Sequence, residues 1–164
     1  MTQKISPCLW FDDNAEEAVK FYTSIFPNSK IREVVPYTVE TPSNKPIGSV
    51  MTVSFELDGY SFLGLNGGPY FKPNPSISFH VKCETKDEVD TIWEKLSENG
   101  KVLMPLDKYP FSERYGWLKD KYGISWQLIT PDFIKLDKNK KVMEAILKMK
   151  RLDIGKLKKA YEGK

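Results

Sequence analysis

The chain has 164 residues, of which 40% are hydrophobic, and a formal net charge of +3, which suits one globular domain or two small halves sharing a core. No run of eighteen apolar residues occurs and the N-terminus lacks a signal-peptide pattern, so we expect neither a membrane span nor secretion. Cys8 and Cys83 have no CxxC partner, and they predict reduced thiols in a cytoplasmic protein.

The positive charge is concentrated near the C-terminus. Residues 135–164 contain eleven Lys or Arg against four Asp or Glu, but only one aromatic residue, Tyr161. A nucleic-acid surface combines basic residues with stacking aromatics, so a solvated helix face explains these lysines better. We therefore expect no nucleic-acid partner.

The first elements along the chain are a short apolar run and a helix. The segment "CLWF" precedes "DDNAEEAVKFYTSIFPN", in which Asp13 or Asn14 can cap the helix and Pro27 and Asn28 stop it. Four apolar residues repeat at helical spacing, namely Ala18, Phe21, Tyr22 and Ile25. An extended segment, "KIREVVPY", and a loop with two prolines and a glycine follow.

A β-hairpin is predicted next. Met51, Val53, Phe55 and Leu57 alternate with polar residues, and Asp58-Gly59 is a preferred two-residue turn. In the returning strand Phe62, Gly64 and Asn66 alternate with Leu63 and Leu65. The segment "GGPYFKPNP" has no periodicity and reads as a linker.

The same order of elements then begins again. "SISFHVKC" alternates, and Thr85 with Glu88 forms a capping box for an amphipathic helix that Gly100 ends. Three extended segments close at "SWQLITP". The order strand–helix–three strands therefore occurs twice, in residues 4–66 and 76–131 of one domain, residues 1–132, which predicts an α+β fold of two similar modules.

A helical C-terminal extension, residues 133–164, is predicted to follow that domain. Its segment "VMEAILKMK" has an apolar stripe that could contact a partner subunit or pack on its own sheet, made of Val142, Met143, Ile146 and Met149.

The alternation also assigns faces to the sheets. If Leu9, Phe11, Ile77, Phe79 and Val81 pack under the helices, the opposite face carries Cys8, Trp10, Ser76, Ser78 and His80, with Thr52, Ser54 and Glu56 from the hairpin. Such a polar face is often simply solvated. We expect Trp10, Phe62 and Gln127 to share it, which favours a lined cavity over a wet surface.

Several long segments resemble one known family. They are "FDDNAEEAVKFYTSIFPNSKI", "LNGGPYFKPNPSISFHVKC", "DEVDTIWEKLSENG", "YPFSERYGWLKDKYGISWQL" and "VMEAILKMKRLDIGKLKKAY". Together they resemble the PhnB-like family, also labelled demethylubiquinone methyltransferase-like. That family belongs to the glyoxalase, bleomycin-resistance and extradiol-dioxygenase superfamily, also called vicinal oxygen chelate. The sequence contains no glycine-rich strand–loop–helix for a methyl donor, so no methyl-donor motif supports the methyltransferase label.

The resemblance implies a glyoxalase-like fold, in which two βαβββ modules form cupped mixed sheets around a cavity. It also implies a homodimer and a divalent metal held by side chains of the first, fourth, fifth and eighth strands. Carried over, those positions fall at Pro7 or Cys8, near Phe62 or Gly64, at Ser76 and at Gln127. Pro, Phe and Gly cannot bind a metal through their side chains, and Ser and Gln are weak ligands. We therefore expect the usual metal site to be dismantled and no cofactor to be present.

From this reading we predict a protein that binds an unidentified small molecule. The predicted ligand-binding residues are Trp10, Phe62, Asn66, Ser78, His80, Trp117 and Gln127. His80, the chain's only histidine, and Glu56 are the candidates for catalysis, although a lone His is more often structural and Glu56 a surface carboxylate. The alternatives are a metal-dependent lyase, isomerase or dioxygenase, with His80, Cys8 and Glu56 as a non-standard ligand set, and a dimeric interaction module.

Overall fold

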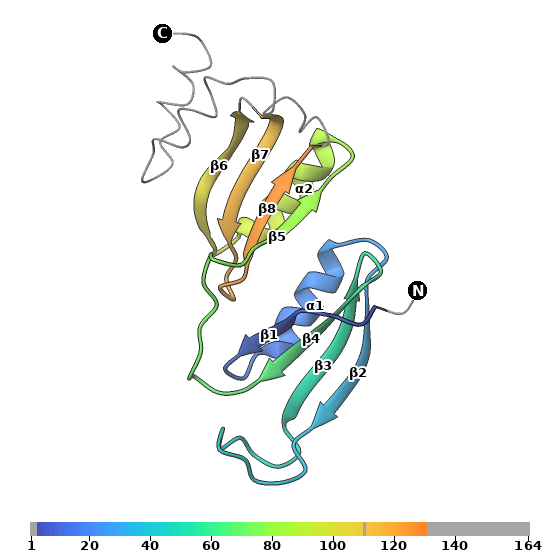
Figure 1. Cartoon of the computed structure of the whole chain (residues 1–164), viewed down its shortest axis with the longest axis vertical. Coiled ribbons are helices and arrows are strands. Elements are labelled where there is room, and N and C mark those ends of the chain that lie inside the picture. Colours follow the sequence, from blue (N-terminus) through green and yellow to red (C-terminus); the bar gives the residue numbers. More distant parts are fainter. Residues whose placement is uncertain (1–2, 110, 131–164) are drawn as a thin grey trace. The chain divides into compact units, whose positions relative to one another are not determined.

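The computed structural model describes residues 3–109 and 111–130 and divides the chain into two compact units, Met1–Asn74 and Pro75–Lys164 (Figure 1). These units correspond to the two predicted modules. The predicted helical extension and its stripe Val142, Met143, Ile146 and Met149 lie outside the described residues.

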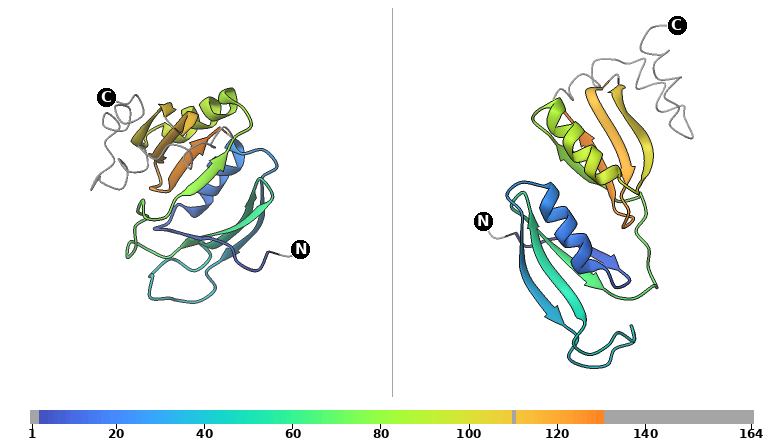
Figure 2. Two further views of the ribbon diagram at one scale, coloured as in Figure 1. Left: turned by 45° about the horizontal axis from the view of Figure 1, so that its top comes forward. Right: turned by 180° about the vertical axis from the view of Figure 1, so that it is seen from behind.

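The first unit is a four-stranded mixed sheet with one helix. Its elements are β1 (Cys8–Phe11), α1 (Ala15–Ile25), β2 (Lys30–Pro36), β3 (Val50–Leu57) and β4 (Tyr60–Asn66). The strand order is β1-β4-β3-β2, with β1 parallel to β4 and the other pairs antiparallel. Helix α1 covers one face of this sheet (Figure 2). It contacts β3, in which Val53 and Phe55 are buried together with the apolar side chains of the helix.

The second unit repeats this topology. Its elements are β5 (Phe79–Lys82), α2 (Lys86–Ser97), β6 (Lys101–Tyr109), β7 (Ser112–Lys119) and β8 (Ser125–Ile129). The order β5-β8-β7-β6 is the counterpart of the first sheet, again with one parallel pair, β5 and β8. The prediction of two βαβββ modules with mixed sheets is therefore confirmed.

The predicted turn and capping chemistry is present. Asp58 and Gly59 both have positive φ, 47° and 78°, which is the backbone of the two-residue turn expected for Asp-Gly. The Thr85 hydroxyl accepts a hydrogen bond from the Glu88 amide at 3.1 Å, so Thr85 caps α2 as predicted. The Glu88 carboxylate accepts from the Glu84 amide at 2.7 Å, one residue before the usual partner in a capping box.

Two local predictions are wrong. Helix α2 ends at Ser97, and the residue with left-handed φ is Asn99 at 56°, so Gly100 is not the residue that turns the chain. A Cβ on Gly100 would lie 2.6 Å from the Lys119 carbonyl oxygen, so close backbone contact requires the glycine there. Strand β5 begins at Phe79, and Ile77, predicted to pack under the helix, is 74% exposed.

Tight packing of α2 on its sheet depends on a second glycine. A Cβ on Gly116 in β7 would lie 2.3 Å from the Trp93 ring of α2, well inside van der Waals contact. Trp93 follows Ile92 in this helix, whose side chains Val89, Ile92 and Leu96 are buried. The absent side chain at Gly116 is therefore what lets the indole lie flat on the strand.

Candidate functional site

The face of the second sheet that points away from α2 carries most of the predicted site residues. Strand pairing places His80 beside Gln127, and Gln127 beside Trp117. The intervening residues Phe79, Trp126 and Leu118 pair with each other on the opposite side, toward α2. This pairing agrees with the predicted directions of His80 and Gln127, and it places Trp117 on the same face.

Gln127 in β8 is the centre of a chain of hydrogen bonds that runs from β7 to the segment just before β5. The Tyr115 hydroxyl donates to Gln127 Oε1 at 2.9 Å, and Gln127 Nε2 donates to Ser78 Oγ at 2.7 Å. The amide thus joins β7 to the segment just before β5. A half-buried amide whose oxygen and nitrogen are both engaged has a fixed orientation.

The inner end of this chain is buried among aromatic and aliphatic side chains. Tyr115 is 6% exposed and packs with a cluster made of Met104, Tyr109, Ile129, Phe111 and Trp117. The Tyr109 and Phe111 rings each meet Tyr115 edge to face, with centroids 5.5 and 5.0 Å away. Desolvation, with a smaller contribution from Tyr109, raises the pKa of Tyr115 to about 12, so its hydroxyl remains a donor at ordinary pH.

Sequence reasoning did not identify Tyr115 as a partner of Gln127. Tyr115 lies two residues before Trp117 in one strand, and alternation alone puts both on the same face. That signal was sufficient to place the residue, although it could not reveal the hydrogen bond.

His80 occupies the outer part of this face. The residue as a whole is exposed, but part of its ring is shielded from water. This partial desolvation, together with the nearby charge of Lys82, lowers the pKa of His80 below its ordinary value. The imidazole is therefore neutral at pH 7, the form in which one ring nitrogen donates and the other accepts.

Trp117 is held by a separate bond. Its indole nitrogen donates to Ser125 Oγ at 2.8 Å, and its ring packs on the aromatic cluster. Because the bond fixes the half-buried indole, Trp117 offers a rigid apolar wall beside Gln127.

The first unit holds the remaining predicted residues in different surroundings. Trp10 lies on the face away from α1, but its indole nitrogen donates to the Gly68 carbonyl at 2.8 Å and Phe71 packs edge to face on its ring at 4.9 Å. A Cβ on Gly67 would lie 2.2 Å from that ring. The segment after β4 therefore covers much of the Trp10 side chain.

Phe62 and Asn66 were assigned to the wrong face. Phe62 pairs with Phe55, and their rings stack at 5.3 Å on the side of α1. Asn66 pairs with Phe11 on the same side and is 4% exposed. The prediction placed them on the face of β3 that carries Thr52 and Ser54. The observed register instead places Ser61, Leu63 and Leu65 on that face.

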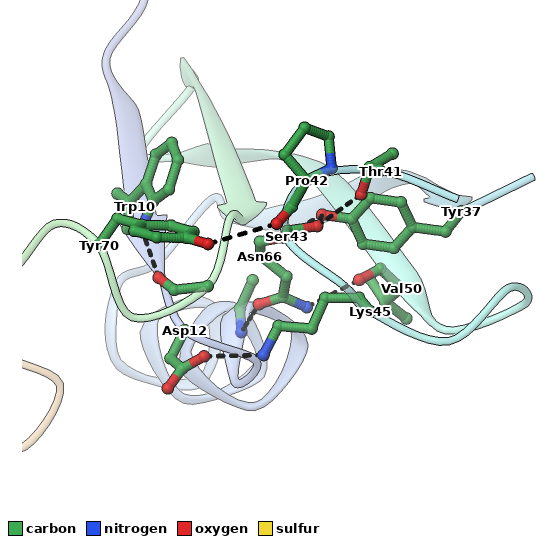
Figure 3. A network of polar contacts seen from close by, with 12 residues as sticks. Trp10, Asp12, Tyr37, Thr41, Pro42, Ser43, Lys45, Val50, Asn66 and Tyr70 are labelled. Carbon is green, nitrogen blue, oxygen red and sulfur yellow. Dashed lines mark hydrogen bonds and ion pairs between the residues drawn. The ribbon is translucent and has the colours of Figure 1, made fainter. Parts of the chain in front are cut away.

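Asn66 has a structural role that Figure 3 shows. Its Oδ1 accepts from the Ala15 amide at 2.8 Å and its Nδ2 donates to the Val50 carbonyl at 2.9 Å. The Tyr37 hydroxyl donates to the Asn66 backbone carbonyl. Asn14, at the N-cap of α1, makes no side-chain cap bond, so Asn66 satisfies the first helical amide from a distant strand.

A half-open cavity of about 490 Å³ lies next to this network. Its lining consists of Asp13, Glu16, Asn44, Lys45, Pro46, Ser49, Val50 and Asn66. Lys45 forms an ion pair with Asp12 at 2.7 Å, and Glu16 forms one with Lys20 at 2.6 Å. Two of the charged residues that line the cavity are therefore already paired. Only Asn66 among these wall residues belongs to the predicted ligand-binding set.

Glu56 does not have the environment of a general base. It pairs with Arg32 at 2.5 Å and with Lys30 at 3.6 Å on the face away from α1. The Arg32 hydrogen bond holds the pKa of Glu56 below its ordinary value, opposite to the raised pKa that a catalytic carboxylic acid at neutral pH would need. Cys8 is exposed and Cys83 is buried, and both are free thiols.

The described side chains do not fit the metal set that the fold implies. In the first sheet the open-face partner of Cys8 is Leu63, a hydrocarbon, and in the second the Gln127 oxygen already accepts from Tyr115. Ser76, taken as the fifth-strand position, precedes β5, where His80 pairs with Gln127 instead. Within residues 3–109 and 111–130 no three His, Cys, Asp or Glu side chains gather in a metal-binding group.

Comparison with known proteins identifies the class. The two βαβββ units match solved structures: a domain from Frankia sp. titled a glyoxylase/bleomycin resistance protein/dioxygenase domain is 14% identical with a TM-score of 0.54, covering 79% of this chain and 92% of its own. A fosfomycin resistance protein from Listeria monocytogenes, solved with Mn(II) and sulfate, is 12% identical with a TM-score of 0.54, over 79% and 90% of the two chains. These likenesses establish a glyoxalase-like fold.

The family follows from closer matches. The family model described as 3-demethylubiquinone-9 3-methyltransferase matches residues 3–129. A Bacillus cereus protein titled a putative 3-demethylubiquinone-9 3-methyltransferase, PhnB protein, is 43% identical with a TM-score of 0.72, over 78% of this chain and 99% of that one. The chain belongs to this PhnB-like family, as its sequence indicated. Among proteins with curated descriptions, none matches the chain.

No helix in the described part of the chain is long and apolar enough to cross a membrane.

Proposed function

We propose that this PhnB-like protein binds a small molecule on the face of the second sheet away from α2, without the usual metal. The observation that carries the proposal is the fixed amide of Gln127, held between Tyr115 and Ser78 and bordered by Trp117 and His80. Rigid apolar walls with a few oriented polar groups are the ordinary composition of a ligand site.

The proposal does not include methyl transfer. The family description names a methyltransferase, but the chain has no glycine-rich strand–loop–helix to hold a methyl donor. His80 remains the candidate for acid–base chemistry because its imidazole is neutral at pH 7 and adjoins Gln127. Glu56 is no longer a candidate, since Arg32 and Lys30 neutralise it.

The test is a thermal-shift screen of small metabolites on the full chain, once with a chelator and once with added divalent metals, followed by calorimetry on each hit. We expect hits in the chelated protein whose affinity falls about tenfold in Gln127→Ala and His80→Ala, from the loss of one hydrogen bond each. Ser54→Ala, at an open-face position of the first sheet, is the control and should change nothing. Hits that are indifferent to both site variants refute the proposal.

A metal-dependent lyase, isomerase or dioxygenase is the alternative outcome. The Listeria protein of the same fold was solved with Mn(II). Stoichiometric iron, nickel, manganese or zinc in the purified chain, together with hits that require it, would favour the enzyme over the metal-free binder.

We also propose that the chain is a cytoplasmic homodimer. Light scattering of the full chain and of a chain ending at Pro131 tests both the dimer and the residues that form it. A dimer that survives truncation unchanged would exclude the C-terminal segment as the interface.

A further inference from the structure

The chain of hydrogen bonds through Gln127 has a direction. Tyr115 is 6% exposed, and among the described residues its hydroxyl proton has Gln127 Oε1 as its acceptor. A buried hydroxyl that keeps no acceptor costs about 1–3 kcal/mol, so the buried end determines which way the amide lies. With its oxygen turned to Tyr115, the amide must present its nitrogen to Ser78.

Ser78 is consequently the outer end of the chain. Its oxygen accepts from Gln127 Nε2 at 2.7 Å, and its own proton has no acceptor among the residues that the structure describes. A serine hydroxyl has one proton to donate. The half-buried Ser78 therefore offers that proton outward, to whatever lies against this face.

The neighbours of Ser78 on this face are donors or cations. His80 and Lys82 follow it at the alternating positions of β5, and the same face of β8 carries Ser125, Gln127 and Ile129, none of which is a carboxylate. The carboxylates on this side belong to β6 and β7: the Asp107 oxygen accepts from the Lys108 amide, and Glu113 pairs with Lys108 at 2.7 Å and Lys86 at 3.8 Å. Both carboxylates are therefore engaged by neighbouring donors and do not repel a negatively charged group placed at Ser78.

We infer that the ligand presents an oxyanion, a carboxylate or a phosphate, to the Ser78 hydroxyl. The inference rests on the proposed function, because it specifies what binds at that same site. A hydroxyl whose oxygen is already used by an amide donor favours an acceptor over an amine or another donor, and a charged acceptor strengthens the bond.

The experiment follows NMR spectra of the full chain during titration with inorganic phosphate, acetate and ethylammonium at constant ionic strength. We expect saturable shifts of the Ser78 and His80 amides and of the Gln127 side chain with at least one anion, and none with ethylammonium. The phosphate and acetate titrations distinguish a tetrahedral from a planar oxyanion. Ser78→Ala should weaken the anion at least about tenfold, and Ser54→Ala should leave it unchanged.

A second variant reverses the direction of this chain of hydrogen bonds. In Gln127→Glu the introduced carboxylate accepts from both Tyr115 and Ser78, so the Ser78 proton turns inward; anion binding should vanish and ethylammonium binding should appear. If this variant does not fold, Ser78→Ala decides alone. Ethylammonium binding to the natural chain as tightly as either anion, or an unchanged anion affinity in Ser78→Ala, overturns the inference. A neutral or cationic screening hit that depends on Gln127 would overturn it while leaving the proposed function intact.

Discussion

The N-terminus of helix α1 is capped by Asn66 of strand β4, and this predicts how much unfolding free energy an Asn66 variant should lose. Asn66→Ala removes the acceptor of the Ala15 amide and the donor to the Val50 carbonyl. Ala15 is fully buried and Asn66 is 4% exposed, so water does not replace the lost partners freely. At about 1–3 kcal/mol for each of these two groups left unpaired, the variant should lose about 2–6 kcal/mol of unfolding free energy.

The matched control is Asn14→Ala. Asn14 is the N-cap by position but its side chain makes no cap bond, so truncation should cost less than about 0.5 kcal/mol. Urea unfolding of both variants measures the free energies, and amide exchange at Ala15 should accelerate only in Asn66→Ala. If Asn14→Ala were the more destabilised variant, or if both lost the same amount, the cross-strand cap would be refuted.

Three further predictions follow from single contacts. Gly116→Ala places a Cβ 2.3 Å from the Trp93 ring and should destabilise by about 1–3 kcal/mol in urea unfolding, a loss that Trp93→Leu in the same chain should relieve. Tyr115→Phe should remove from the ultraviolet titration the tyrosine that ionises near pH 12. Because burial raises the pKa of Tyr115, the contribution of its protonated hydroxyl to stability is complete below pH 10 and is lost as pH rises through about 12. The single imidazole in the proton NMR spectrum should titrate below its ordinary pKa, and Lys82→Gln should raise that pKa; a value unmoved by the substitution would contradict the assignment of its cause.

Local sequence patterns predicted the elements because each has its own chemical signature. The Asp58-Gly59 turn needs positive φ at both residues, and Thr85 with Glu88 marks a helix start; both are observed. The repeated order of elements then determined the topology, and the long family segments fixed the fold.

The side of a residue in the hairpin was harder to predict. Alternation defines two faces, but it does not say which face continues across a turn, and Phe62 and Asn66 were placed on the wrong one. A two-residue turn pairs Leu57 with Tyr60 and therefore Phe55 with Phe62, so counting outward from Asp58-Gly59 would have corrected the assignment. The cap from Asn66 to Ala15 could not be found that way, because it joins residues 51 positions apart.

Comparison of the two modules shows why the candidate site lies in only one of them. Both sheets have a parallel pair at corresponding places, and on the face away from the helix β1 and β4 present Cys8 with Leu63, whereas β5 and β8 present His80 with Gln127. The first pair is a thiol and a hydrocarbon, neither of which orients a polar ligand, and burial raises the pKa of the Cys8 thiol. The second pair is an imidazole and a fixed amide. At these corresponding positions, the described residues pair two polar side chains in the second module and not in the first, so we expect variants of Gln127 and Ser78 to affect ligand affinity and Ser54→Ala in the first module to leave it unchanged.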